Sequence, residues 1–291
     1  MRLVYLNGCM QELEEAKISV QDRGFLFGDG IYEVIWCWQG RLFRLEAHLE
    51  RLEKSAEAIE LELPLSRAEL AEVARGLAGE AHRSGLNPAQ IYIQVTRGPA
   101  ERNHAFPESP QPTVLAMVQA AHLAPPQYRE QGVKVITTPD IRWRWCRVKS
   151  INLLPNVLAK EKAKRQGAYE AIFCEESGTV NEGSSTNIFL VKDGVIITPS
   201  LDNNILPGIT RAAILEAVRA AGLAVEERRV YVDELYAADE VFLSGTLSEV
   251  MPVVVVDDRT VGSGQPGPLT RQVYQLLLGL MRQELGPDLP G

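Results

Sequence analysis

Lys149 lies in a stretch of the sequence that is both basic and apolar. Residues 141–155 carry Arg142, Arg144, Arg147 and Lys149, and no acid occurs between Asp140 and Glu161. We expect the apolar members of the stretch to be buried: Trp143, Trp145, Val148, Ile151, Leu153 and Leu154. Burial beside cations disfavours a charged amine, so Lys149 becomes a candidate nucleophile toward carbonyl compounds. A lysine that extends to solvent or pairs with a carboxylate is the ordinary alternative, which this stretch alone favours.

Three small polar segments could complete a site around such an amine. In the segment 179–187, Glu182 precedes Gly183 and two serines, which is typical of a turn but could also aim a carboxylate into a cleft. In Pro207-Gly-Ile-Thr-Arg211, proline and glycine lead into an expected helix whose first amides, at Ile209 and Thr210, could bind an anion. The segment 244–249 again offers small hydroxyl residues at the end of a strand.

Each of these segments has an ordinary reading as a turn or a helix cap. Together they offer an amine nucleophile, an anion site and a carboxylate that could pair with a protonated ring nitrogen. That combination is what pyridoxal 5′-phosphate (PLP) requires of a protein.

Periodic patterns predict the elements that must position these residues. Leucines at 45, 49 and 52 predict a helix on which His48 and Arg51 share a face. A strand at 90–97 alternates apolar and polar residues and runs into a loop that presents Arg102 and His104. Residues 121–131, with Pro125-Pro126, are the best linker candidate. We therefore predict an α+β fold with domains at 1–120 and 132–291.

Composition excludes several other classes. A net charge of −8 and a pI near 5.2 argue against nucleic acid or an anionic membrane as the main partner. No apolar run approaches the roughly 20 residues that span a bilayer. Residues 1–8 lack a charged region followed by a long apolar one, so we expect them to form a strand and not a signal peptide. The four cysteines and four histidines show neither a disulfide framework nor metal-ligand spacing, so we expect no metal site and a reduced, cytoplasmic protein.

The chain resembles the class IV (fold type IV) PLP-dependent aminotransferases, and within them the bacterial D-amino-acid (D-alanine) aminotransferases. The resemblance keeps the family's order from about residue 20 to 250. It rests on residues 22–33, His48-Leu-Glu-Arg51, 95–98, Arg102-x-His104, Phe106-Pro107, 148–154, 181–187, 206–211 and 244–249.

The resemblance implies a small N-terminal α/β domain, a larger C-terminal domain with a mixed, barrel-like sheet, and PLP at the domain interface. Lys149 would be the catalytic residue, binding the cofactor covalently and moving a proton. Glu182 would pair with the ring nitrogen, and Leu206 would support one face of the ring. The phosphate would be bound by Arg51, Ile209, Thr210, Gly245 and Thr246.

Substrate preference would depend on Tyr32, Arg102 and His104. The resemblance implies that Arg102 and His104 come from the neighbouring subunit of a homodimer with shared active sites, and hold the substrate α-carboxylate. The expected substrates are amino acids and 2-oxo acids, with D-alanine and 2-oxoglutarate giving pyruvate and D-glutamate. The alternative is that Arg102 and His104 are ordinary solvated loop residues.

Two departures from the pattern leave the substrate open. Pro207 follows the branched-chain form of the motif, and Gly245 replaces a hydroxyl residue often found there. The alternative activities are an L-branched-chain-amino-acid aminotransferase and an aminodeoxychorismate lyase. A non-catalytic PLP-binding protein would also be consistent with the fold, although Lys149 and Glu182 are both present.

Overall fold

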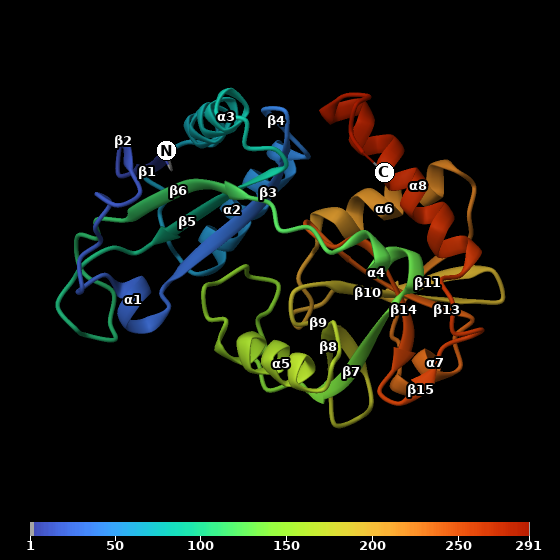
Figure 1. Cartoon of the computed structure of the whole chain (residues 1–291). Coiled ribbons are helices and arrows are strands. Elements are labelled where there is room, and N and C mark those ends of the chain that lie inside the picture. Colours follow the sequence, from blue (N-terminus) through green and yellow to red (C-terminus); the bar gives the residue numbers. More distant parts are fainter. Residues whose placement is uncertain (1–2, 291) are drawn as a thin grey trace. The chain divides into compact units, whose positions relative to one another are not determined.

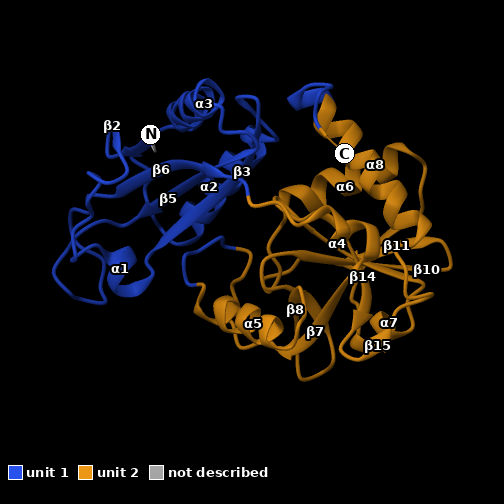
Figure 2. Ribbon diagram, in the orientation of Figure 1, with its two compact units in different colours: residues 1–121, 148–152, 283–289 blue, residues 122–147, 153–282, 290–291 orange. Residues whose placement is uncertain are grey.

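The chain folds into two units, each built around one β-sheet (Figures 1 and 2). The structure is a computed structural model and describes residues 3–290. Unit 1 comprises Met1–Ala121, Val148–Asn152 and Gln283–Leu289, and unit 2 comprises His122–Arg147, Leu153–Arg282 and Pro290–Gly291. The short segment that carries Lys149 therefore groups with unit 1, apart from its neighbours in the sequence.

Unit 1 contains a six-stranded sheet with the order β2-β1-β6-β5-β3-β4 and antiparallel neighbours throughout. Its strands are β1 (Leu3–Leu6), β2 (Cys9–Glu12), β3 (Gly30–Trp38), β4 (Arg41–Leu42), β5 (Ala89–Thr96) and β6 (Thr113–Ala120). The predicted alternation in β5 is confirmed, because Ile91, Ile93 and Val95 are fully buried. The polar face of the same strand carries Tyr92 and Gln94.

The helices of unit 1 are α1 (Arg23–Phe27), α2 (Leu45–Ala58) and α3 (Arg67–Arg83). Leu49 and Leu52 of α2 are fully buried in a core shared with α3 and the sheet. Ser66 and Glu69 form the capping box that begins α3. The leucine periodicity therefore predicted α2 correctly, with His48 and Arg51 both buried on it.

Unit 2 contains a nine-stranded mixed sheet with the order β12-β11-β10-β13-β14-β7-β8-β9, and β15 pairs with β14. Its strands are β7 (Val133–Pro139), β8 (Glu170–Cys174), β9 (Val180–Gly183), β10 (Asn187–Lys192), β11 (Val195–Pro199), β12 (Val225–Arg228), β13 (Glu240–Gly245), β14 (Glu249–Val256) and β15 (Arg259–Thr260). The pairs β14–β7, β7–β8 and β11–β12 are parallel and the others are antiparallel. The sheet curls like half a barrel, which confirms the predicted α+β class.

The helices of unit 2 are α4 (Pro126–Gln131), α5 (Leu154–Arg165), α6 (Ile209–Ala220), α7 (Val232–Tyr236) and α8 (Pro268–Leu285). The segment 121–131 thus contains a helical turn, α4, which packs against β14. The last residues of α8 group with unit 1. Within residues 3–290, no helix has the length and apolar character needed to cross a membrane.

The expected burial of the apolar residues near Lys149 is wrong for both tryptophans and for Leu154, which is 68% exposed. Trp143 is 41% exposed and Trp145 is 37% exposed. Their rings pack edge to face with centroids 6.0 Å apart, and Arg147 lies over Trp145. The two indoles therefore pack against each other and against the Arg147 guanidinium, and not in a hydrophobic core. Of the apolar residues in this stretch, Val148 is the one that enters the core of unit 1.

Candidate active site

Lys149 is fixed to unit 1 through its backbone. The Tyr32 amide donates to the Lys149 carbonyl at 3.0 Å, and the Lys149 amide donates to Ser55 Oγ at 3.1 Å. Its Nζ lies 4.2 Å from the centre of the Tyr32 ring. The amine of half-buried Lys149 therefore lies against the face of the Tyr32 ring. Both residues are candidate site residues from the sequence, and the structure brings them into contact.

Tyr92 extends this aromatic group. Its ring stacks on Tyr32 with centroids 5.8 Å apart, and its hydroxyl donates to Gln94 at 2.6 Å. Burial, with a smaller effect from Tyr32, raises the pKa of Tyr92 to about 12, so the phenol stays protonated at neutral pH. Tyr92 was not predicted, because the alternation of β5 gives its face but not its neighbour across the sheet.

Arg51 and His48 of α2 converge on Glu33, which is completely buried on β3. Arg51 donates through Nε and a terminal nitrogen to the two carboxylate oxygens at 2.7 and 2.8 Å, and His48 Nδ1 lies 2.8 Å from the same carboxylate. Burial alone would raise the pKa of Glu33, but the charge of Arg51 and the hydrogen bonds from Arg51 and His48 outweigh it and lower the pKa to about 2.

Burial lowers the pKa of His48, with smaller opposing effects from Glu33. A neutral His48 can donate only from Nδ1 here, because the ionised Glu33 carboxylate only accepts. Glu33 thus fixes the guanidinium plane of Arg51 and the tautomer of His48. The sequence signal for Glu33 is a single acid within the apolar strand that begins at Gly30, and no local pattern indicates its contact with α2.

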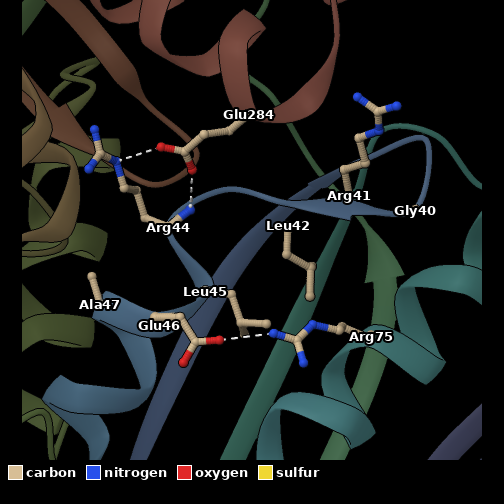
Figure 3. Close-up of a pocket in the computed structure, with 9 residues that line it drawn as sticks. All are labelled: Gly40, Arg41, Leu42, Arg44, Leu45, Glu46, Ala47, Arg75 and Glu284. Atoms are coloured by element: carbon tan, nitrogen blue, oxygen red, sulfur yellow. Dashed lines mark hydrogen bonds and ion pairs between the residues drawn. The ribbon is translucent and has the colours of Figure 1, made fainter.

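The start of α2 is held by the end of α8 (Figure 3). Arg44 precedes the helix with φ of 54°, a left-handed conformation that is strained for a residue with a side chain. Its amide donates to Glu284 at 3.0 Å, and its Nε lies 2.9 Å from the same carboxylate. These residues line a pocket of about 570 Å³ that includes none of the predicted site residues and lies one turn before His48. We therefore infer that the contact between Arg44 and Glu284 anchors the start of α2.

Arg102 and His104 lie on an exposed loop of unit 1. The Arg102 guanidinium lies 5.2 Å from the centre of the Phe27 ring, and the His104 and Phe27 rings are 5.5 Å apart. Buried Arg23 donates to the carbonyls of Asn103, His104 and Ala105, at 2.6 to 3.3 Å. The loop backbone is therefore fixed while both polar side chains face outward around Phe27.

In unit 2, the buried carboxylate of Glu182 accepts hydrogen bonds at both of its oxygens. Arg142 Nη1 donates to Oε1 at 2.5 Å, while Asn187 and the Leu206 amide donate to Oε2 at 3.2 and 3.0 Å. Arg142 in turn binds Asp140 through two nitrogens, at 3.0 and 2.7 Å.

Burial opposes both charges of the Arg142–Asp140 pair, but their mutual attraction prevails. The pKa of Asp140 is lowered by its hydrogen bonds with Arg142 and Asn181, and the pKa of Arg142 is raised by its bonds to Asp140 and the charge of Glu182. The sequence indicates Arg142 only as one of the cations near Lys149, because its contact with Glu182 spans 40 residues of the chain.

Asn187 joins the three polar segments predicted from the sequence. Its amide nitrogen donates to Glu182 and to the Leu206 carbonyl, and its backbone pairs with Ser244 across β10 and β13. A Cβ on Gly208 would lie 2.0 Å from Asn187 Oδ1, so any side chain at this position would displace Asn187. The segments 179–187, 206–211 and 244–249 therefore meet at one residue.

The arrangement in unit 2 fits an anionic group. Gly208 caps α6 without a side chain, which leaves the first-turn amides of Ile209 and Thr210 free of a side-chain cap. Ser244 Oγ is buried and has no hydrogen-bond partner among residues 3–290. Gly245 follows it as the last residue of β13, and Thr246 begins the turn to β14. Buried donors of this kind are suited to phosphate oxygens.

The structure groups the predicted residues into two sets. Lys149, Tyr32, Arg51 and the Arg102–His104 loop belong to unit 1, and Glu182 and the residues of the segments 206–211 and 244–249 belong to unit 2. Each set is consistent with one part of a PLP site: a nucleophilic amine with an arginine, and a carboxylate with an anion-binding helix terminus.

The sequence pattern of the amino-transferase class IV family matches residues 30–256. The chain therefore belongs to this family, and as a class IV aminotransferase it depends on PLP. It is 44% identical over 275 residues to a D-alanine aminotransferase of Staphylococcus epidermidis, covering 94% of this chain and 96% of that relative. It is 42% identical over 274 residues to a D-alanine aminotransferase of Bacillus licheniformis, covering 94% and 95%.

Solved structures give the same fold. The Escherichia coli branched-chain amino acid aminotransferase matches with a TM-score of 0.89 and 31% identity, covering 98% of this chain and 96% of that chain. The branched-chain aminotransferase of the archaeon Thermoproteus uzoniensis, solved with norvaline, matches with a TM-score of 0.84 and 29% identity, covering 98% and 95%.

Proposed function

We propose that this enzyme transaminates D-amino acids, converting D-alanine and 2-oxoglutarate to pyruvate and D-glutamate. The observation that carries the proposal is the 44% identity to a D-alanine aminotransferase over nearly the whole chain. The loop with Arg102 and His104 supports it, because Arg23 holds that loop in a defined shape with both side chains accessible.

Lys149 is the proposed catalytic residue, and Glu182 is proposed to bind the cofactor. PLP, when bound, supplies a conjugated ring that accepts the electron pair from the substrate Cα–H bond. Lys149 would hold the cofactor through its amine and would move the proton of the substrate Cα. Glu182, held by Arg142 and Asn187, would pair with the ring nitrogen, and Leu206 would support one face of the ring.

We propose that the phosphate of the cofactor is bound by Arg51, Ile209, Thr210, Gly245 and Thr246. Ile209 and Thr210 offer the amides at the start of α6, Gly245 ends β13, and Thr246 follows it. Arg51 contributes a guanidinium whose orientation is fixed by Glu33. A guanidinium carries five N–H groups, and two of those of Arg51 bind Glu33.

The substrate carboxylate is held by Tyr32, Arg102 and His104. An arginine binds a carboxylate through two parallel hydrogen bonds and so fixes its orientation. Orientation decides which enantiomer directs its Cα–H toward Lys149, and this is how the loop would select D-amino acids.

We further propose a cytoplasmic homodimer in which Arg102 and His104 serve the partner's site. Leu154, Val157 and Leu158 of α5 are between 54% and 68% exposed and lie three and four residues apart, so they form an aliphatic stripe that a second copy could cover. The cysteines are free, which is consistent with a reducing compartment. The small domain is proposed at 1–120 and the large one at 132–291, joined by 121–131.

An L-branched-chain activity is the second candidate, because the branched-chain enzymes match the fold with TM-scores up to 0.89. The two candidates are separated by steady-state assays with D-alanine and L-leucine as donors and 2-oxoglutarate as acceptor. We expect turnover with D-alanine.

The Arg102→Ala variant tests the proposed carboxylate site. We expect its KM for D-alanine to rise at least tenfold while its affinity for PLP stays within about twofold, because a lost bidentate contact costs on the order of 1.5–3 kcal/mol. Unchanged kinetics would remove Arg102 from the substrate site.

A further inference from the structure

Glu170 is a fully buried carboxylate in β8 that no role above explains. Its side chain is surrounded by the turn that follows Glu182. Ser184 Oγ donates to Oε1 at 2.5 Å, Ser185 Oγ donates to Oε2 at 2.8 Å, and Thr186 Oγ1 donates to Oε2 at 3.4 Å. Three consecutive hydroxyls therefore face one acid.

Other contacts complete the environment of this carboxylate. The Ala171 amide donates to Oε1 at 2.9 Å, and Lys160 Nζ of α5 lies 3.5 Å from Oε2. A buried carboxylate is stable only when donors or cations replace its lost hydration. Glu170 therefore needs hydrogen-bond donors, and the hydroxyls of residues 184–186 supply three of them.

The turn at residues 183–186 is closely packed, which restricts its backbone conformation. The Gly183 amide donates to the Thr186 carbonyl at 2.7 Å, and the Ser184 amide donates to the Ala171 carbonyl at 2.9 Å. A Cβ on Gly183 would lie 2.1 Å from Thr186 Oγ1 and 3.1 Å from Glu170 Cγ. Glu182 directly precedes this turn and Asn187 directly follows it.

We propose that Glu170 is a positioning residue, whose buried carboxylate gathers the hydroxyls of Ser184, Ser185 and Thr186 and so fixes Glu182 and Asn187 for the cofactor. This inference rests on the proposed function for its catalytic consequence. The geometry of the turn can be tested without activity.

A second consequence concerns the three hydroxyls. Each hydroxyl can donate one hydrogen bond, and each of the three donates it to Glu170. These side chains therefore cannot also donate to a phosphate, and the phosphate depends on the proposed set of Arg51, the α6 amides, Gly245 and Thr246. We expect Ser185→Ala to change PLP affinity less than twofold.

The test compares Glu170→Gln and Glu170→Asp with Glu240→Gln. Glu240 is a similarly buried acid of unit 2, but it accepts from the Leu269 and Thr270 amides at the start of α8. Hydrogen exchange is measured on the peptide that spans 180–187 in each purified chain without added PLP. We expect exchange at Gly183 and Ser184 to accelerate tenfold or more in Glu170→Gln, less in Glu170→Asp, and not in Glu240→Gln.

The catalytic consequence is measured on the PLP-loaded variants. We expect kcat of Glu170→Gln to fall at least tenfold with KM for D-alanine within threefold, partial rescue in Glu170→Asp, and wild-type kcat in Glu240→Gln. If Glu170→Gln does not fold, Ser184→Ala removes one donor and should show the same changes more weakly.

The outcomes separate this inference from the proposed function. Unchanged exchange in 180–187, or acceleration spread evenly over unit 2, would overturn the positioning role of Glu170. Local acceleration in a folded variant that keeps wild-type kcat would also overturn it. If the wild-type chain shows local protection but no transamination, the proposed function fails while the hold of Glu170 on the turn stands.

Discussion

The carboxylate of Glu33 is completely buried, and an ion pair with Arg51 and a hydrogen bond from His48 stabilise its charge. Breaking such a buried pair leaves an uncompensated charge, which typically costs about 3–5 kcal/mol. We therefore expect Glu33→Gln to lower the free energy of unfolding by this amount and to weaken PLP binding, because Arg51 loses its orientation. Urea unfolding and PLP titration of the variant check both effects. A variant with wild-type stability would contradict the account of this cluster.

The same cluster predicts acid sensitivity of the wild-type chain. The folded pKa of Glu33 is about 2, below the ordinary value of 4.5. A carboxyl with a depressed folded pKa contributes stability above its unfolded pKa and loses it as the pH falls toward the folded value. We expect a loss of about 3 kcal/mol between pH 4.5 and 2, seen as a falling urea midpoint. Glu33→Gln should lack most of this slope, and an equal slope in both chains would be inconsistent with the assignment.

Lys149 is the residue on which turnover depends most. We expect Lys149→Ala to lose transamination by a factor of 10³ or more, because it removes both the nucleophile and the proton carrier. The exposed Lys164→Ala is the matched control and should retain wild-type kcat. Transamination by Lys149→Ala at the wild-type rate would refute the assignment.

At the scale of elements, Asn187 and Gly208 connect the start of α6 to Glu182. A methyl group at Gly208 would lie 2.0 Å from Asn187 Oδ1, so the asparagine must move in Gly208→Ala. We expect PLP affinity to fall about tenfold or more, because a displacement that costs on the order of 1–3 kcal/mol acts on the cofactor-binding residues. Gly279→Ala in α8, where a Cβ meets open space, is the control. Equal PLP affinity in both variants would separate Gly208 from the site.

The elements that the sequence predicted best are those with strong local periodicity. The leucines of α2 and the alternation of β5 each determine a buried face within a few residues. The motif segments likewise pointed to Lys149 and Glu182, because small polar residues beside strands are visible locally. Contacts across long sequence separations were not accessible. The pairing of Glu33 with α2, the bridge from Asn187 to Leu206, and the exposure of Trp143 and Trp145 depend on tertiary packing that no local pattern records.

At the scale of the whole molecule, the homodimer proposal makes a test by complementation possible. If Arg102 serves the partner's site, a dimer of one Lys149→Ala and one Arg102→Ala subunit carries both defects in one site and neither in the other. Random reassortment of two equal pools should then restore about a quarter of the wild-type activity at low D-alanine concentration. No recovery, in a mixture shown by mass spectrometry to contain heterodimers, would place Arg102 in its own subunit's site or outside it.

The aliphatic stripe of α5 provides an independent test of the same assembly. We expect Leu158→Glu to shift the protein toward a monomer and to reduce activity with it, because a charge at the centre of an apolar interface is left without a partner. Light scattering after size-exclusion chromatography measures the change. Leu201→Glu, an exposed leucine outside α5, is the control. An unchanged dimer in the Leu158 variant would exclude this face.

The central claim is a PLP-dependent aminotransferase that selects D-amino acids. Its most direct test is the visible absorption of the purified, PLP-loaded enzyme after separate addition of D-alanine and L-leucine. We predict that the band of the lysine-bound cofactor is lost with D-alanine and persists with L-leucine. Loss with L-leucine alone would preserve the fold and the cofactor and contradict the D-amino-acid assignment, and the absence of any such band would contradict the role of Lys149.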